Sequence, residues 1–352
     1  MTPPVELAGL RARVDKALAA FLAEQRTRLT TIDPALAEVS DALEDFVLGG
    51  GKRLRPAFAY WGFRGAGGTD ADAVVAALSA LELVQASALI HDDLMDASDT
   101  RRGVPSVHRR FERRHREASW RGTPEGFGEN AAVLLGDLAL VWSDELLHDS
   151  GLSPAELVRA RPVFDEMRTE VTVGQYLDVL TQATADTSLD RAGKVARFKA
   201  AKYTVERPLL LGAAIAGAPP EVSASYSAFG LPLGEAFQLR DDILGVFGDP
   251  SQTGKPAGDD LREGKRTYLI AAAFGLLDDP EKTELDAALG DPGLQVERLR
   301  ALIRECGALT ATEHRIDELM SASLAALEAA PIEEEARTVL HALADAATRR
   351  TV

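Results

Sequence analysis

The segment His91-Asp92-Asp93-Leu94-Met95-Asp96 follows a mainly apolar run at residues 74–90. We predict that this run is one buried helix and that the carboxylates close its C-terminal end. Asp92 and Asp96 then stand one turn apart on the same face, close to the negative end of the helix dipole. Such a pair favours Mg²⁺, which binds one or two carboxylates together with water and phosphate oxygens. The alternative interpretation is a solvated acidic helix end.

A second acidic pair, Asp241-Asp242, follows another mainly apolar stretch at residues 231–240. Two acidic ends that face each other across a helical bundle would form a box for two or three metal ions. The chain lacks the period-two alternation that is typical of sheets. We therefore predict an all-α fold, a single large helical bundle around a central cavity.

The composition is that of a globular protein with a sizeable core. The chain has 352 residues, of which 46% are hydrophobic and 27% charged, and no polar linker divides it, so we expect one domain over residues 1–352. The net charge of -16 argues against nucleic acid as a partner. Any phosphate site must then be built locally, from clustered cations or metal ions.

The expected location is the cytoplasm. Cys306 is the only cysteine, which excludes an intramolecular disulfide and a thiolate metal cage and fits a reducing compartment. The first ten residues lack the layout of an export signal. No uncharged stretch is longer than residues 208–220, which are too few to span a bilayer, so we expect no membrane span.

A glycine triplet precedes a cluster of cations. Gly49-Gly50-Gly51 ends a predicted helix and is followed by Lys52, Arg53 and Arg55. Flexible glycine backbone would allow amide groups and cations to converge on a diphosphate. The alternative is an ordinary helix cap followed by a charged surface.

The spacing of apolar residues predicts helices through most of the chain. Gly174 lies inside a long predicted helix and costs about 1 kcal/mol relative to alanine, which close packing or the approach of a ligand would justify. Pro208 is expected to kink another. A glycine-rich loop is expected at residues 120–129, and helices are expected at residues 5–30, 34–48, 74–90, 131–147, 154–180, 191–217 and 221–247.

Five motifs occur in the order and approximate spacing of the trans-isoprenyl diphosphate synthases, and the chain resembles this family over about residues 45–270. The matching segments are Gly51-Lys52-Arg53-Leu54-Arg55-Pro56, Asp92-Asp93-Leu94-Met95-Asp96, Arg101-Arg102-Gly103, Gly174-Gln175 and Phe237-Gln238-Leu239-Arg240-Asp241-Asp242.

The resemblance implies the helical isoprenoid synthase fold and a reaction without a protein nucleophile. An allylic diphosphate ionises, and isopentenyl diphosphate attacks the carbocation. Asp92, Asp96 and Asp241 would hold Mg²⁺, three ions per active site, and Asp93 and Asp242 belong to the same acidic motifs. The allylic diphosphate would be held by Arg101, Lys199 or Lys202, Gln238 and Lys255, and isopentenyl diphosphate by Lys52, Arg55, Gln85 and Arg102, with Arg53, Thr204 and Lys265 as further substrate-binding positions.

The chain departs from the family pattern at three positions. Gly245 stands where many relatives have a third aspartate. The usual Lys-Thr pair is replaced by two partial matches, Lys199 and Lys202 with Thr204, of which we favour Lys199. Gln85 stands where some members have histidine, and both side chains can donate to a phosphate.

The resemblance and the size of two side chains together predict the product. In the family, bulky residues just before the first acidic motif close the floor of the pocket. Ser87 and Ala88 are small, so another residue, such as Val84, Leu81 or one from residues 171–180, must set the floor. We expect geranylgeranyl diphosphate, with farnesyl or longer products as alternatives.

Two other classes of protein remain open at this stage. A class I terpene cyclase would share the fold and the first acidic motif, but it would not need Lys52 and Arg55. A non-catalytic subunit of a heteromeric synthase is supported only by Gly245 and the altered Lys-Thr pair. The family also implies a homodimer.

Overall fold

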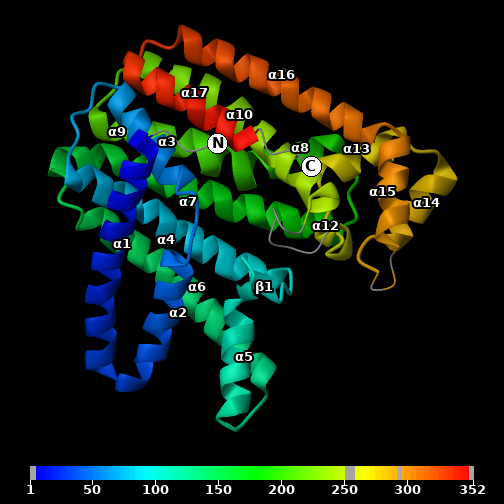
Figure 1. Ribbon diagram of the computed structural model, residues 1–352, viewed down its shortest axis with the longest axis horizontal. Helices are drawn as coiled ribbons and strands as arrows, with labels where there is room; N and C mark the ends of the chain where they lie inside the picture. The colour runs from blue at the N-terminus through cyan, green and yellow to red at the C-terminus, as the bar shows by residue number, and fades with distance from the viewer. Residues whose placement is uncertain (1–4, 250–257, 292, 294, 349–352) are drawn as a thin grey trace.

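Helices make up nearly all the regular structure of the computed structural model, which describes residues 5–249, 258–291, 293 and 295–348 (Figure 1). In chain order the elements are α1 (Val5–Ile32), η1 (Pro34–Leu36), α2 (Ala37–Leu48), α3 (Leu54–Gly65), α4 (Asp72–Met95), β1 (Thr100–Arg101), β2 (Val104–Pro105), α5 (Val107–Glu117), α6 (Pro124–His148), α7 (Pro154–Ala183), α8 (Leu189–Val195), η2 (Ala196–Glu206), α9 (Arg207–Ala216), α10 (Pro220–Phe247), α12 (Asp259–Arg262), α13 (Tyr268–Leu276), α14 (Asp279–Ala288), α15 (Val296–Glu305), α16 (Ala308–Ala329) and α17 (Glu334–Thr348).

Two long helices carry the two acidic motifs. α4 packs along α6 and α3, and α10 packs along α16 and η2. The larger core cluster surrounds α4 before its acidic end and includes the fully buried Phe58, Leu81 and Phe164. A second cluster lies around α13, α15 and the C-terminal part of α10. The prediction of an all-α bundle is confirmed.

Helix α4 resembles a membrane span in its length and hydropathy. It has 24 residues with a mean hydropathy of 1.9 over its most apolar window. Within the bundle, however, 72% of that window is buried. Apolar side chains all round a helix are equally typical of the centre of a helical core.

Several helix ends lie where the sequence predicts them. Asp33 accepts a hydrogen bond from the backbone N–H of Ala35 at the start of η1, and Ser153 and Glu156 form a capping box at the start of α7. The prediction of a loop at residues 120–129 is wrong for residues 124–129, which belong to a helix. Proline suits the first turn of a helix, and α6 begins at Pro124 despite the glycines that follow.

The helix expected at residues 191–217 is divided into three parts. Its middle part, η2, is a π-helix of 11 residues, and the N–H of Arg207 donates to the carbonyl of Lys202, five residues earlier. Pro208 lies in the first turn of α9, where its missing N–H is harmless. Where the sequence predicts a kink at Pro208, the structure therefore has a π-helix, which is wider than an α-helix and ends just before the proline.

A short hairpin follows α4. Thr100 pairs with Pro105 and Arg101 with Val104, while Arg102 and Gly103 both have positive φ. A two-residue turn with positive φ at both positions matches the natural twist of the two strands that it joins. The hairpin turns the chain back at the end of α4 and presents its arginines to the cavity described below.

Candidate active site

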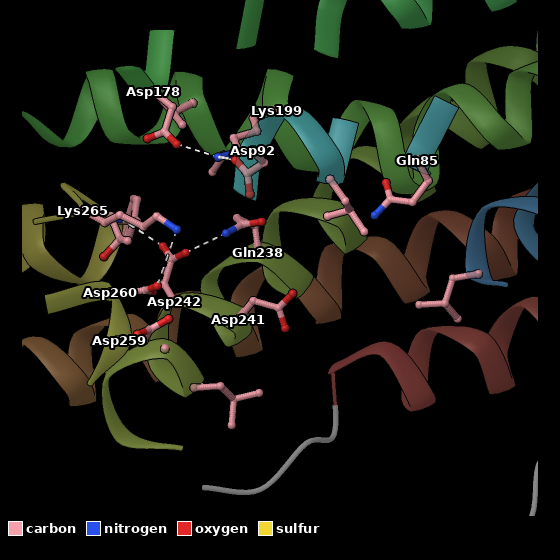
Figure 2. A pocket seen from close by; sticks show the side chains of 18 of the residues that line it. Gln85, Asp92, Asp178, Lys199, Gln238, Asp241, Asp242, Asp259, Asp260 and Lys265 are labelled. Carbon is pink, nitrogen blue, oxygen red and sulfur yellow. Dashed lines mark hydrogen bonds and ion pairs between the residues drawn. The ribbon is translucent and has the colours of Figure 1, made fainter. Parts of the chain in front are cut away.

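A cavity of about 850 Å³ lies between the ends of α4 and α10 (Figure 2). Its size suits a small organic ligand. Its walls come from α4, α7, α8, η2, α10 and α12, from the hairpin after α4, and from the chain that leads into α3 and α13. Of the predicted site residues it is lined by Lys52, Arg53, Arg55, Gln85, Asp92, Arg101, Arg102, Lys199, Gln238, Asp241, Asp242 and Lys265.

Asp92 is the centre of the first acidic end. One oxygen accepts from Nζ of Lys199 at 3.2 Å and from Nε2 of Gln175 at 3.0 Å, and Lys199 also lies 2.6 Å from Asp178 (Figure 2). Burial works to raise the pKa of Asp92, but the positive charges of Lys199 and Lys265 outweigh burial and lower it to about 2. Asp92 is thus ionised in the free protein.

Asp93 is turned away from the cavity toward Arg101. Its side chain is 1% exposed and accepts from Nε of Arg101 at 2.8 Å and from Nη2 at 2.5 Å. A forked arginine–carboxylate pair of this kind fixes the plane of the guanidinium. Asp93 therefore positions Arg101, which lines the cavity.

Asp96 lies beside the cavity, next to Lys265. Its Oδ2 atom is 2.8 Å from Nζ of Lys265, and the same nitrogen is 2.5 Å from Glu263. Burial, and then repulsion by Asp92, raise the pKa of Asp96 despite the neighbouring Lys265. The two carboxylates of this motif thus crowd each other, as the sequence predicts.

The second acidic end combines an accessible and a buried aspartate. Asp241 is partly exposed and lines the cavity, whereas Asp242 is only 3% exposed. Asp242 accepts from Nε2 of Gln238 at 2.8 Å and from the backbone N–H of Tyr268 at 3.1 Å. Burial raises the pKa of Asp242 to about 7, and the nearby charges of Asp260 and Asp241 add to this shift.

The donor set fits Mg²⁺. Hard carboxylate oxygens reach the cavity from both acidic ends, Asp92 on α4 and Asp241 on α10. Among the described residues, no three candidate ligands converge closely enough to hold an ion by themselves. This is the situation that suits Mg²⁺, which keeps waters and takes phosphate oxygens in addition to one or two carboxylates. When bound, the metal would neutralise a departing diphosphate.

The opposite part of the cavity is lined by cations around a glycine-rich loop. Gly50 and Gly51 have φ values of 128° and 135°, which favour glycine. Nη1 of Arg102 donates to the carbonyl of Gly50 at 2.6 Å. Lys52 and Gln85 also line the cavity. This is the place that the sequence predicts for a second diphosphate.

The protein itself holds the guanidinium of Arg53. Nε donates to Asp15 on α1 at 2.7 Å, Nη1 to Glu82 on α4 at 2.7 Å, and Nη2 to the carbonyl of Val47 at 2.7 Å. Its side chain is 5% exposed. Arg53 thus joins three helices behind the cation loop, a positioning role rather than direct contact with a diphosphate.

Arg55 is held by residues of the π-helix. Nη2 of Arg55 donates to Oγ1 of Thr204 at 2.8 Å, and its guanidinium lies 4.3 Å from the ring centre of Tyr203. Thr204 does not line the cavity itself. The wide turn of η2 presents these consecutive residues to α3, so Thr204 positions Arg55.

The structure separates the two candidate lysines. Lys199 lines the cavity, whereas Lys202 lies outside the lining, with its Nζ 2.5 Å from Glu170. The preference for Lys199 therefore agrees with the geometry. Lys255 lies outside the described residues.

The residues predicted to limit chain length lie on two stripes of α4. Leu81, Gln85, Ala88 and Asp92 are separated by three or four positions and share one stripe of α4, of which Gln85 and Asp92 line the cavity. Val84 and Ser87 share a second stripe with His91, whose ring packs against Gly136 of α6. Val84, Ser87 and Ala88 are absent from the lining itself, which includes Leu89.

Sequence reasoning named Gln175 of α7 only as part of a family motif, without a role, and missed Asp178 on the same helix. Gln175 and Asp178 hold Asp92 and Lys199 in place, and Asp178 lines the cavity. They follow Gly174, whose hydrogen faces the backbone of Lys199, as the expected close packing requires. A buried aspartate one turn beyond a helical glycine was the available signal.

The fold and site combine a helical bundle with a cavity lined by carboxylates and cations, which suits a diphosphate bound through metal ions. Residues 37–306 match the family model of the polyprenyl synthetases. A geranylfarnesyl diphosphate synthase of Aeropyrum pernix is 32% identical over 312 residues, 87% of this chain and 92% of the relative. A geranylgeranyl diphosphate synthase of Mycobacterium tuberculosis is 33% identical over 282 residues, 79% of this chain and 75% of the relative.

A solved structure agrees with these relatives. The geranylgeranyl pyrophosphate synthase of Corynebacterium glutamicum, in complex with isoprenyl diphosphate and magnesium, superimposes with a TM-score of 0.94. It is 43% identical, with 97% of this chain and 99% of that chain covered. The chain therefore belongs to the polyprenyl synthetase family.

Family membership gives the reaction class. The protein is a prenyltransferase that elongates an allylic diphosphate with isopentenyl diphosphate. In this structure Lys199 and Arg101 lie beside Asp92, while Arg102 contacts the glycine loop that precedes Lys52 and Arg55, and all five cations line the cavity. The two groups of cations can hold two diphosphates, which a cyclase with a single substrate does not need.

Proposed function

We propose that the enzyme makes geranylgeranyl diphosphate, a C20 product, with three Mg²⁺ ions in each active site and in the cytoplasm. The observation that carries the product length is the stripe of α4 below Asp92. Its next position, Ala88, is small, and the large, fully buried Leu81 lies two turns below Ala88 on the same stripe. A growing chain that follows this stripe passes Ala88 and stops at Leu81.

The first experiment measures product length. Pure protein is incubated with Mg²⁺, radiolabelled isopentenyl diphosphate and C5, C10 or C15 allylic diphosphates, and the products are separated after removal of the diphosphate. We expect one C20 band with each primer, lost with EDTA and restored with excess Mg²⁺. A C15 or C25 band would refute the proposed product while preserving the reaction class.

Replacement of Ala88 by phenylalanine is expected to shorten the product to C15 or less, because the ring would fill the stripe one turn below Asp92. The matched variant is Ser87→Phe, whose ring would face the stripe with His91 and α6. We expect that variant to lose thermal stability by overpacking and to keep C20 as its main product. Equal shortening in both variants would contradict the division into two stripes.

We further propose that the active form is a homodimer formed through α6 and α7. The apolar side chains exposed on these helices include Leu134 and Val141 on α6 and Val158 and Tyr176 on α7, each more than 60% exposed. The two faces adjoin, since Asp144 of α6 lies 3.3 Å from both Arg161 and Arg168 of α7. Exposed apolar side chains on adjacent helices are typical of an interface between subunits.

The double variant Leu134→Glu/Val141→Glu is expected to be monomeric, because a second copy would bury its charges. Light scattering after gel filtration should give a mass close to the 37.6 kDa of one chain, and about twice that for the unchanged protein. The control pair Ile32→Glu and Leu276→Glu alters exposed apolar residues on α1 and α13. An unchanged protein that elutes as a monomer would refute the dimer.

A further inference from the structure

The two acidic helix ends differ at one position. On α4 the carboxylates occupy positions 92, 93 and 96. On α10 Asp241 and Asp242 are followed by Gly245, which takes the place that corresponds to Asp96. The second motif therefore lacks a carboxylate one turn beyond its first aspartate.

The carboxylate of Asp260 occupies the space that Gly245 leaves. A Cβ atom on Gly245 would lie 1.9 Å from Oδ2 of Asp260 and 2.4 Å from its carboxyl carbon. Position 245 lies on the same face of α10 as Asp241, with about 5–6 Å between Cβ positions. Asp260 thus puts a carboxylate where a third acidic side chain of α10 would begin.

The position of Asp260 is fixed by the packing of α12. Leu261 is fully buried in the second core cluster, and its carbonyl accepts from the backbone N–H of Gly290 at 3.0 Å. Asp260 lines the cavity, and its Oδ1 atom is 4.0 Å from Nζ of Lys265. The same nitrogen is 2.8 Å from Asp96, so Lys265 lies between the two acidic ends (Figure 2).

We propose that Asp260 supplies the third carboxylate of the second acidic end, and that residue 245 must be glycine to admit it. The proposal rests on the use of Mg²⁺ and a diphosphate by this enzyme, but not on the product length. Asp260 then orients the waters or the metal on the α10 side of the cavity, the role that the family resemblance implies for Asp96 beside α4. The rival interpretation is that Asp260 only neutralises Lys265.

The test exchanges the carboxylate between the two positions. Mg²⁺ binding in the presence of inorganic diphosphate is measured by titration calorimetry for the Asp260→Ala, Gly245→Asp and double variants. We expect Asp260→Ala and Gly245→Asp each to weaken binding by about 10- to 100-fold, the range for partners of metal ligands. Gly245→Asp fails alone because its Cβ displaces Asp260. The double variant returns a carboxylate to this face without that clash. Its affinity for Mg²⁺ should therefore be about 10- to 100-fold higher than that of Asp260→Ala.

Three further variants separate this role from folding. Asp260→Asn keeps the shape of the side chain and should weaken Mg²⁺ binding at an unchanged melting temperature. Gly275→Ala places a Cβ in open space on α13, and Asp317→Asn removes an exposed charge from α16, so both should bind as the unchanged protein does. A double variant that binds Mg²⁺ no better than Asp260→Ala would overturn the proposal, as would a Gly245→Asp variant that binds Mg²⁺ as tightly as the unchanged protein.

Product analysis of the unchanged enzyme is a separate readout. An enzyme that makes C15 or C25 would refute the C20 product, whereas the exchange between positions 245 and 260 is judged from Mg²⁺ binding alone. The two failures are therefore distinguishable.

Discussion

Replacement of Asp92 by alanine is expected to lower the rate of prenyl transfer on the order of a thousandfold, the upper range for the loss of one group that stabilises developing charge. Asp92 is the cavity-lining carboxylate of α4, and it holds both Lys199 and Gln175. Incorporation of radiolabelled isopentenyl diphosphate measures the effect.

The fold should survive this change. Lys199 keeps its contact with Asp178, and removal of Asp92 relieves its repulsion of Asp96. Helical content by circular dichroism is therefore expected to match that of the unchanged protein. Asp149→Ala, at the exposed end of α6, is the matched control and should retain full activity. Near-normal turnover of Asp92→Ala would contradict the assignment of this carboxylate to the metal site.

The second large effect is expected for Gly174→Ala. Its Cβ atom would lie 2.4 Å from the backbone nitrogen of Lys199 and 2.7 Å from the carbonyl carbon of Phe198, and backbone atoms cannot move aside as flexible side chains do. α7 and η2 would have to separate. We expect a loss of about 1–3 kcal/mol in the free energy of unfolding, the usual cost of overpacking.

The separation of α7 and η2 should also lower the rate of prenyl transfer. Gln175, Asp178 and Lys199 meet at this contact, and a displacement of about 1 Å in a positioned group can cost about a hundredfold in rate. The control is Gly193→Ala in α8, which meets open space and should be neutral or slightly stabilising. Melting temperature and kcat are measured for both variants. If Gly174→Ala behaves like its control, α7 and η2 are less closely fixed than their geometry indicates.

The helices and the cavity-lining charges could be predicted because each leaves a local pattern. Residues 74–90 show apolar spacing, the acidic pairs end apolar helices, and Pro154 follows a capping serine. These features depend on neighbours a few positions away. The hairpin at Arg102-Gly103 has strands of only two residues, too short for a period-two pattern to show.

What could not be predicted depends on distant contacts. The turn geometry of η2 has no sequence pattern of its own, so the sequence could favour Lys199 but could not show that Lys202 lies outside the cavity lining. In the sequence Arg53 is one more cation of its loop. Only the structure shows that it forms ion pairs with Asp15 and Glu82 from two other helices. Gly245 likewise reads as a missing ligand until Asp260 is found beside it.

The lysines between the acidic ends make metal and diphosphate binding mutually dependent. Lys199 and Lys265 already act as counter-ions to Asp92 and Asp96 in the free protein. A divalent cation that enters alone must compete with these ammonium groups. When the cation enters together with a diphosphate, the phosphate oxygens become new hydrogen-bond acceptors for both lysines. Thermodynamic linkage then requires each ligand to raise the affinity for the other by the same factor, and we expect divalent ions alone to bind the free enzyme more weakly than they bind in the presence of diphosphate.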